Sequence, residues 1–349
     1  MIATKPDISL EQAAERLRKG EVVAFPTETV YGLGADVWNA DAVRRIFALK
    51  GRPPDNPLIV HVSNREMVES LVTGVSEDAA QLMEQFWPGP LTIIFPKRPE
   101  VLDIVTAGIP TVAIRMPDHP VPLRLISETG PLAAPSANTS GRPSPTRAEH
   151  VRQDFGDDVP VIEGGSCQYG LESTVLDLSR KPYTILRPGY ITQSELEKVL
   201  RQPVRMAQYH LHDAGEQMHA GEQTHTGDTP RSPGMKYTHY APDAHVRWMT
   251  HNELPFPDPL SENTLYLMHR IQTGAFEDIG TDRSETGLSD GDDRIVHYRE
   301  NYTEMARDLY DRFRMADLKG YAEVAIEPFP AWQESTEALV NRIRKAIGT

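Results

Sequence analysis

The stretch FPTETVYGLG, residues 25–34, constrains the fold more than any other part of the chain. It follows an apolar run at residues 21–25 of the kind that forms a short buried strand. Pro26 ends that strand, and a loop of small hydroxyl, acidic and glycine residues follows. Open α/β sheets usually bind ligands in such loops at the ends of buried strands. We therefore expect this loop to form one wall of a ligand pocket.

Size and charge narrow the class of protein. A chain of 349 residues exceeds what one hydrophobic core usually serves, so two domains are expected. The hydrophobic fraction of 39% and charged fraction of 25% are typical of globular proteins. A formal charge of −14 disfavours a broad electrostatic grip on nucleic acid or an anionic membrane. Any anionic ligand must therefore meet a local cluster of basic residues.

The single cysteine, Cys167, excludes an internal disulfide and a CxxC metal site, and suits a reducing compartment. No apolar run approaches the length of a membrane span, and the first residues lack the apolar core of a signal peptide. These features predict a cytoplasmic protein.

Helical and strand patterns mix along the chain without strict alternation, which predicts an α/β fold with a twisted mixed open sheet. Residues 1–202 form the expected catalytic domain, and residues 203–243 a linker that loses periodicity and gains histidine and glycine. Residues 244–349 form a second, smaller Rossmann-like α/β domain. Expected helices include 41–49, 76–86, 195–200 capped by Ser194, 302–315 and 335–347, and expected strands include 58–62, 91–95, 111–115, 173–178 and 183–187.

Four basic residues lie at strand ends or in a proline-stiffened loop: Lys50, Arg52, Arg115 and Arg187. Cations at several strand ends can converge on one anion, and arginine suits bidentate contact with phosphate or carboxylate. Each residue alone would more often be solvated surface charge. The four together favour an anion pocket.

A hydroxyl-rich loop, residues 135–146, directly follows an expected strand and contains Ser136, Asn138 and Ser144. Small hydroxyls and free backbone N–H groups can cradle phosphates, although the same residues are common in ordinary turns. The chain lacks the GxxxxGK[ST], HExxH and GxSxG patterns, so P-loop, zincin and α/β-hydrolase chemistries have no support.

Histidines allow two further interpretations. His61 interrupts the apolar strand LIVHV and is either a structural residue or a ligand contact. Four linker histidines suggest a metal, but their irregular surroundings disfavour one, and we expect no metal site in the protein. These residue patterns alone predict an α/β protein with a pocket that binds an anion, for example a nucleotide.

Six motifs in order resemble the YrdC-like family in its two-domain form. They are PTETVYGLG (26–34), KGRPPDNPL (50–58) with His61, TVAIRMP (111–117), PSANTSGRPSPT (135–146), STV (173–175) and RPG (187–189). SPGMKYTHYAP (232–242) resembles the linker signature of the longer members. The resemblance implies an enzyme that condenses L-threonine, bicarbonate and ATP, with Mg²⁺, into threonylcarbamoyladenylate and pyrophosphate. The product would serve N6-threonylcarbamoyladenosine formation at position 37 of tRNA, through a separate transferase complex and without stable tRNA binding by this chain.

The resemblance also assigns residues. Lys50 and Arg52 would be catalytic. L-Threonine would be held by Thr29, His61, Arg115, the backbone of Ala134, and Thr174, with Arg115 on its carboxylate. ATP would contact Lys50, Arg52, Asn56, Thr111, Ser136, Asn138, Ser144, Arg187 and Tyr237. The signature at 232–242 would close over the nucleotide as a lid.

Two other functions remain open. One is a non-catalytic module that binds double-stranded RNA or a nucleotide, against which the acidic charge argues. The other is a carbamoyl-transferring maturation factor, whose zinc-finger segments this single-cysteine chain cannot supply.

Overall fold

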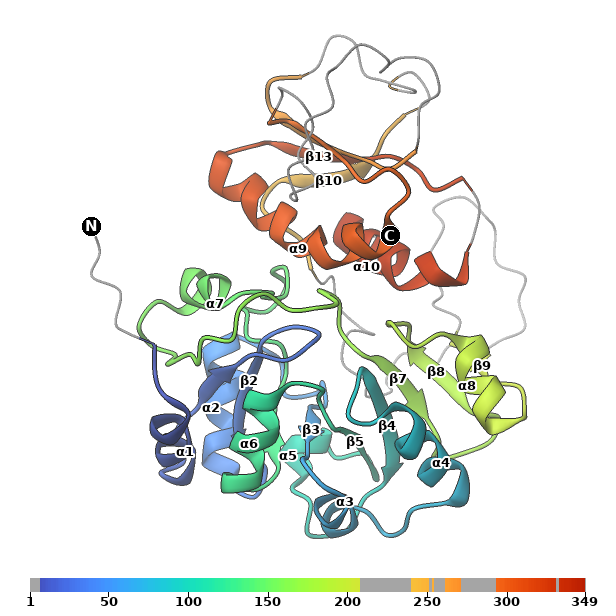
Figure 1. Cartoon of the computed structure of the whole chain (residues 1–349). Helices are drawn as coiled ribbons and strands as arrows, with labels where there is room; N and C mark the ends of the chain where they lie inside the picture. The colour runs from blue at the N-terminus through green and yellow to red at the C-terminus, as the bar shows by residue number, and fades with distance from the viewer. Residues whose placement is uncertain are drawn as a thin grey trace, which may run out of the picture.

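The computed structural model describes residues 7–207, 240–250, 253, 261–270, 293–330 and 333–348. Within these residues the chain forms one nine-stranded and one four-stranded sheet. Figure 1 shows the larger sheet in the blue-to-yellow part of the chain and the smaller one in the orange-to-red part. The predicted mixed α/β sheet with a second, smaller α/β domain is confirmed. The domain limits at residues 202 and 244 stay predictions.

The large sheet has the strand order β1-β2-β6-β3-β5-β4-β7-β8-β9. Three neighbouring pairs are parallel, β3 with β5, β4 with β7 and β8 with β9, and the others are antiparallel. The strands are β1 Val23–Phe25, β2 Gly32–Asp36, β3 Ile59–His61, β4 Leu91–Pro96, β5 Thr111–Arg115, β6 Leu132–Ala133, β7 Thr174–Asp177, β8 Thr184–Arg187 and β9 Arg205–Met206.

One face of this sheet carries most of the apolar core. Val60 and Ile114 point to that face and pack with apolar residues of α2, α3 and α4. Alternate residues on the same strands, such as Ile59 and Ala113, belong to a much smaller cluster on the other face. That second face therefore has room for polar side chains. The helices are α1 Leu10–Arg18, α2 Ala40–Lys50, α3 Arg65–Leu71, α4 Glu77–Phe86, α5 Asp103–Thr106, α6 Pro120–Thr129, α7 Ala148–Phe155 and α8 Gln193–Leu200.

The expected loop at residues 26–34 is partly wrong, because its end is the strand β2, paired antiparallel with β1. The phenyl ring of Phe25 lies over the glycines of β2. A Cβ placed on Gly34 would be 2.5 Å from that ring, and one on Gly32 would be 3.1 Å from it. The glycines therefore let the hairpin close over a buried aromatic ring, and the polar loop shortens to residues 26–31.

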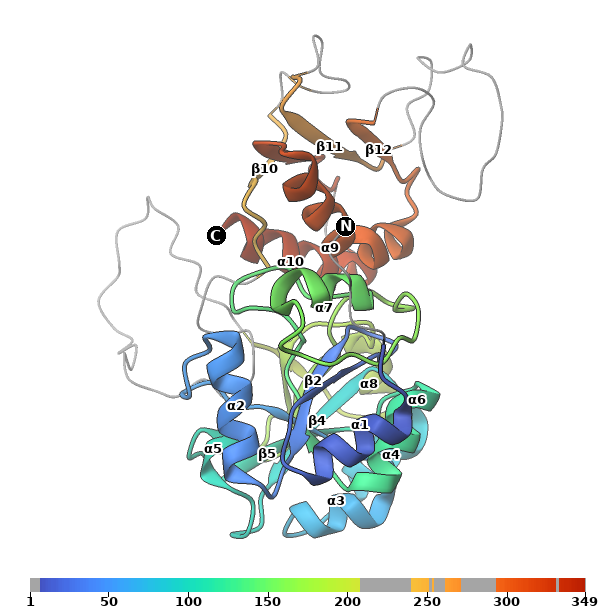
Figure 2. The ribbon, with the colours of Figure 1, turned by 90° about the vertical axis from the view of Figure 1, so that its left-hand side faces the viewer.

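The four strands of the C-terminal sheet are all parallel, in the order β10-β13-β11-β12. Figures 1 and 2 show its two long helices, α9 and α10, between this sheet and the larger domain. On α9, Arg314 donates to both carboxylate oxygens of Asp154 on α7, at 2.8 and 3.0 Å. The bounds are β10 His245–Trp248, β11 Thr264–Met268, β12 Ile295–His297, α9 Tyr302–Lys319, β13 Glu323–Ile326, the short 3₁₀ helix Glu334–Thr336, and α10 Glu337–Ile347.

Two further expectations concern the N-cap of α8 and the linker signature. The N-cap of α8 is Thr192, not Ser194, because Thr192 and Glu195 form a capping box that satisfies two backbone N–H groups. The linker signature lies outside the described residues except for residues 240–242, as do the four linker histidines. Among the described helices, none has both the length and the apolar character that crossing a membrane requires.

We predict that Gly34→Ala lowers the free energy of unfolding by about 1–3 kcal/mol, because the new methyl group would displace the buried Phe25 ring. Urea denaturation measures the change. Gly74→Ala is the matched control, since a Cβ there meets no atom within 4 Å. Equal stabilities for the two variants would contradict the packing argument.

Candidate functional site

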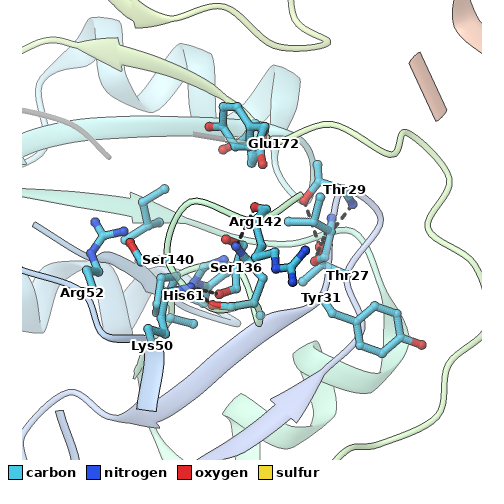
Figure 3. A pocket seen from close by; sticks show the side chains of 18 of the residues that line it. Thr27, Thr29, Tyr31, Lys50, Arg52, His61, Ser136, Ser140, Arg142 and Glu172 are labelled. Carbon is cyan, nitrogen blue, oxygen red and sulfur yellow. Dashed lines mark hydrogen bonds between the residues drawn. The ribbon is translucent and has the colours of Figure 1, made fainter. Parts of the chain in front are cut away.

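A pocket on the polar face of the large sheet gathers side chains from separate elements. Nine of the predicted site residues line it: Thr29, Lys50, Arg52, His61, Arg115, Ala134, Ser136, Asn138 and Arg187. Figure 3 draws Lys50 and Arg52 toward one end of the view and Thr27 and Thr29 toward the other, with Ser136 and Arg142 between. Residues that are far apart in sequence thus converge on one cavity.

Arg115, the last residue of β5, lies at one end of the pocket and contacts several groups there. Its Nη1 donates to Thr29 Oγ1 at 2.8 Å, and its Nε donates to the carbonyl of Gly89 at 3.2 Å. Its Nη2 lies 2.5 Å from a carboxylate oxygen of Glu28, and both side chains are buried. Such a pair is costly to break, because each charge is already out of water. The guanidinium is therefore held in a fixed orientation.

His61 lies beside Arg115, since the two residues are paired across β3 and β5. Burial, followed by the charge of Arg115, lowers the pKa of His61 to about 3. The imidazole is therefore neutral at pH 7. Its buried Nδ1 has no hydrogen-bond partner among the described residues. A neutral ring with one open nitrogen can bind a polar substrate group without adding charge.

Lys50 dominates the opposite end. The last residue of α2, it donates through Nζ to the carbonyl oxygens of Ser136, at 2.7 Å, and Asn138. Burial, followed by the charge of Arg52, lowers the pKa of Lys50 well below its ordinary value. These contacts tie the end of α2 to the hydroxyl-rich loop. They also place the ammonium group where an anionic ligand would restore its preference for the charged form.

The two other cations are also oriented by backbone carbonyls. Arg52 donates to the carbonyl of Pro57 at 3.0 Å, and Arg187 donates to the carbonyl and hydroxyl of Ser173, both at 3.1 Å. These contacts fix the direction of each guanidinium. This end of the pocket is suited to an anion with several oxygen atoms.

Four of the predicted residues that the structure describes do not line the cavity. Thr174 is buried and donates to the carbonyl of Ile191, and Ser144 donates to Glu172. Thr111 shares a strand face with Arg115 but lies four residues away, about 13 Å along β5. Asn56 is buried with its Oδ1 unpartnered among the described residues. Tyr237 lies outside the described residues.

Several lining residues were not predicted: Thr27, Tyr31, Ser140, Arg142, Glu172, Ser173 and Tyr240. Most are immediate neighbours of predicted residues in the same motifs, so the motifs contained a signal for them. Tyr240 belongs to the linker signature at 232–242, which is expected to close over the nucleotide. Glu172 is different, because its place in the pocket depends on contacts with the C-terminal domain, which no local pattern reveals.

The described residues give little support for metal-dependent chemistry or for a cysteine nucleophile. The described residues hold no group of three or more histidine, cysteine, aspartate or glutamate side chains arranged for a metal ion. Cys167 is buried, and burial raises the pKa of its thiol to about 12, so it is no nucleophile at neutral pH.

The pocket volume is about 70 Å³, smaller than the roughly 300–1,000 Å³ of typical ligand sites. A nucleotide would therefore require rim side chains such as Arg142 to move. A larger hollow of about 740 Å³ lies near α1 and α7, but exposed side chains of both charge signs line it. Of these two cavities, the smaller one is the better candidate for the site, because buried cations converge on it and not on the larger one.

Comparisons with known proteins agree with this geometry. Residues 15–189 match the family model Sua5_yciO_yrdC, described as "Telomere recombination". Residues 191–348 match a model described as "Threonylcarbamoyl-AMP synthase, C-terminal domain". The chain belongs to the two-domain Sua5/YrdC family.

Three relatives that match nearly the whole chain are named threonylcarbamoyl-AMP synthase. A threonylcarbamoyl-AMP synthase of Bacillus subtilis is 43% identical over 347 residues, covering 98% of this chain and 94% of the relative. The crystal structure of P. abyssi Sua5 complexed with L-threonine has a TM-score of 0.77 at 36% identity, covering 99% of this chain and 96% of that one. A Pseudomonas putida protein of the same name matches over 181 residues at 41% identity, which is 52% of this chain but 97% of that protein.

We predict that His61 makes stability depend on pH. Its folded pKa of about 3 lies below the ordinary value of 6.5, so the stabilisation is complete above pH 6.5 and is lost progressively as the pH falls toward 3. Between pH 6.5 and 4.5 the loss would be about 2–3 kcal/mol. Urea unfolding of His61→Gln should show a shallower pH dependence. Parallel curves for the two proteins would contradict the assignment, and exposed His245→Gln is the control.

Proposed function

We propose that the chain synthesises L-threonylcarbamoyladenylate from L-threonine, bicarbonate and ATP, releasing pyrophosphate. The observation that carries the proposal is the convergence of Lys50, Arg52, Arg115, Ser136 and Arg187 on one pocket. The L-threonine complex of P. abyssi Sua5, similar over nearly the whole chain, supports threonine as one substrate. The full-length relatives named threonylcarbamoyl-AMP synthase support ATP as the adenylate donor.

In this proposal the two ends of the pocket bind different substrates. Arg115 binds the threonine carboxylate, and neutral His61 with Thr29 binds its polar groups without placing a second cation beside its amine. Ala134 contributes its backbone and Thr174 supports the same side. Lys50, Arg52 and Arg187 bind the ATP phosphates with the hydroxyl-rich loop, and Asn56, Thr111, Asn138 and Ser144 stay predicted ATP residues. Lys50 and Arg52 act as catalytic cations.

The chemistry needs positioning more than a protein nucleophile. The threonine amine and bicarbonate combine to a carbamate and water. A carbamate oxygen then attacks the α-phosphorus of ATP, and pyrophosphate leaves with its electron pair. Carbamates break down readily in water, so a small pocket that excludes water protects the intermediate. Fixed cations stabilise the charge that develops on the phosphates.

Mg²⁺ is expected to accompany ATP rather than to occupy a protein site. The described residues supply no acidic cluster for it, and the pocket carboxylate Glu172 is already engaged by Ser144 and by Arg342. Magnesium commonly keeps several waters and binds through substrate phosphates. In the cell the product would pass in the cytoplasm to a transferase complex that modifies position 37 of tRNA.

The direct test is a reaction containing ATP, Mg²⁺, bicarbonate and isotopically labelled threonine. We predict pyrophosphate release that requires both threonine and bicarbonate, with a product of the mass of threonylcarbamoyladenylate.

Lys50→Met should reduce the rate of this reaction on the order of 10²-fold, because it removes a cation from the reacting phosphates. Lys19→Met, at an exposed position, is the control. Unchanged turnover in Lys50→Met would contradict its role.

We also predict that Arg115→Lys weakens threonine binding by roughly 10–100-fold, since lysine cannot make the bidentate contact with a carboxylate. ATP affinity should change less than about twofold, because Arg115 lies at the other end of the pocket. Calorimetric titration measures both, with exposed Arg124→Lys as control. A loss confined to ATP binding would reverse the proposed orientation of the substrates.

A further inference from the structure

Glu172 is a buried carboxylate on the wall of the pocket, just before β7. From the catalytic side it accepts a hydrogen bond from Ser144 Oγ at 2.6 Å. From the C-terminal domain it accepts one from the Tyr310 hydroxyl at 3.1 Å and one from Arg342 Nε at 2.8 Å. One carboxylate thus joins the hydroxyl-rich loop to both α9 and α10.

The groups from the C-terminal domain are fully buried around it. Arg342 and Tyr310 have no exposed surface. The guanidinium of Arg342 lies 5.5 Å from the centre of the Tyr240 ring, and that ring stacks on Tyr310 with centroids 5.4 Å apart. Because Tyr240 also lines the pocket, the C-terminal domain determines the shape of this wall through two contacts.

A buried carboxylate facing a phosphate site is a liability unless its charge is balanced. Burial raises the pKa of Glu172, but the charges of Arg342 and Arg187 and the hydrogen bonds from Ser144 and Arg342 together outweigh that effect, so the pKa lies below its ordinary value. Glu172 is therefore ionised. Without Arg342 its negative charge would be less well balanced on a pocket wall where the proposed function places the ATP phosphates.

The same loop is held a second time from the C-terminal domain. Arg314 on α9 donates to the carbonyl of Pro143, at 2.6 Å, the residue directly before Ser144. Its pair with Asp154 is buried on both sides. Helix α9 thus holds the backbone before Ser144 directly, and α9 and α10 hold the hydroxyl of Ser144 through Glu172.

We propose that Arg342 is a positioning residue for the ATP end of the pocket. It neutralises and orients Glu172, which in turn holds Ser144. The inference rests on the proposed function and extends it, because it makes the C-terminal domain part of the nucleotide site. The alternative is that the Arg342–Glu172 pair only fastens the two domains.

The test measures ATP and threonine affinities by calorimetry, together with KM and kcat. Arg342→Met should weaken ATP binding roughly tenfold or more, with threonine affinity changed less than about twofold. The double variant Arg342→Met/Glu172→Gln should recover most of the ATP affinity, because it removes the unbalanced carboxylate while keeping an acceptor for Ser144. Arg344→Met removes a charge from an exposed position on the same helix and should have no effect.

Tyr310→Phe is the milder second variant, which removes one hydrogen bond to Glu172 and should weaken ATP binding by about 2–5-fold. If ATP affinity is unchanged in both Arg342→Met and Tyr310→Phe, this inference is overturned and the proposed function still stands. A double variant that binds ATP no better than Arg342→Met would overturn the inference as well, since lost packing cannot be repaired at Glu172. Absence of ATP binding by the unsubstituted protein would overturn the proposed function and this inference with it.

Discussion

The burial of basic side chains on one face of the large sheet is the constraint on which the site depends. Such charges are costly to bury unless polar atoms hold them. For Lys50 those atoms are the carbonyls of Ser136 and Asn138, and for Arg115 they are Glu28, Thr29 and Gly89. The two ends differ accordingly. A carboxylate partner restrains Arg115, whereas carbonyls orient Lys50 and leave its charge to be satisfied by a ligand.

The C-terminal domain contributes to this balance because its helices, rather than its sheet, face the large domain. Arg314 and Arg342 form ion pairs with Asp154 and Glu172, which both follow the hydroxyl-rich loop in the sequence. The relative from P. putida, about half as long, shows that proteins of this name need not have a chain of this length. In this chain the buried charge of Glu172 needs a cation, and the C-terminal domain supplies one in Arg342.

The parts of the fold with local signals could be predicted from the sequence. TVAIR is β5 with the expected limits. The cations that end β5 and β8, Arg115 and Arg187, line one pocket because these two strands run in the same direction. β2 was missed because its glycines are explained only by the Phe25 ring packed against them. Glu172 was missed for a similar reason: its partner Arg342 is 170 residues away, and only the docking of α10 joins them.

The measurement that tests the central claim most directly is a crystal structure with L-threonine and a non-hydrolysable ATP analogue bound together. The account predicts both ligands in the one pocket, with the threonine carboxylate on Arg115, the phosphates against Lys50 and Arg52, and the amine directed at the α-phosphate. Ligands found in separate cavities, or a nucleotide lying against Arg115, would contradict it.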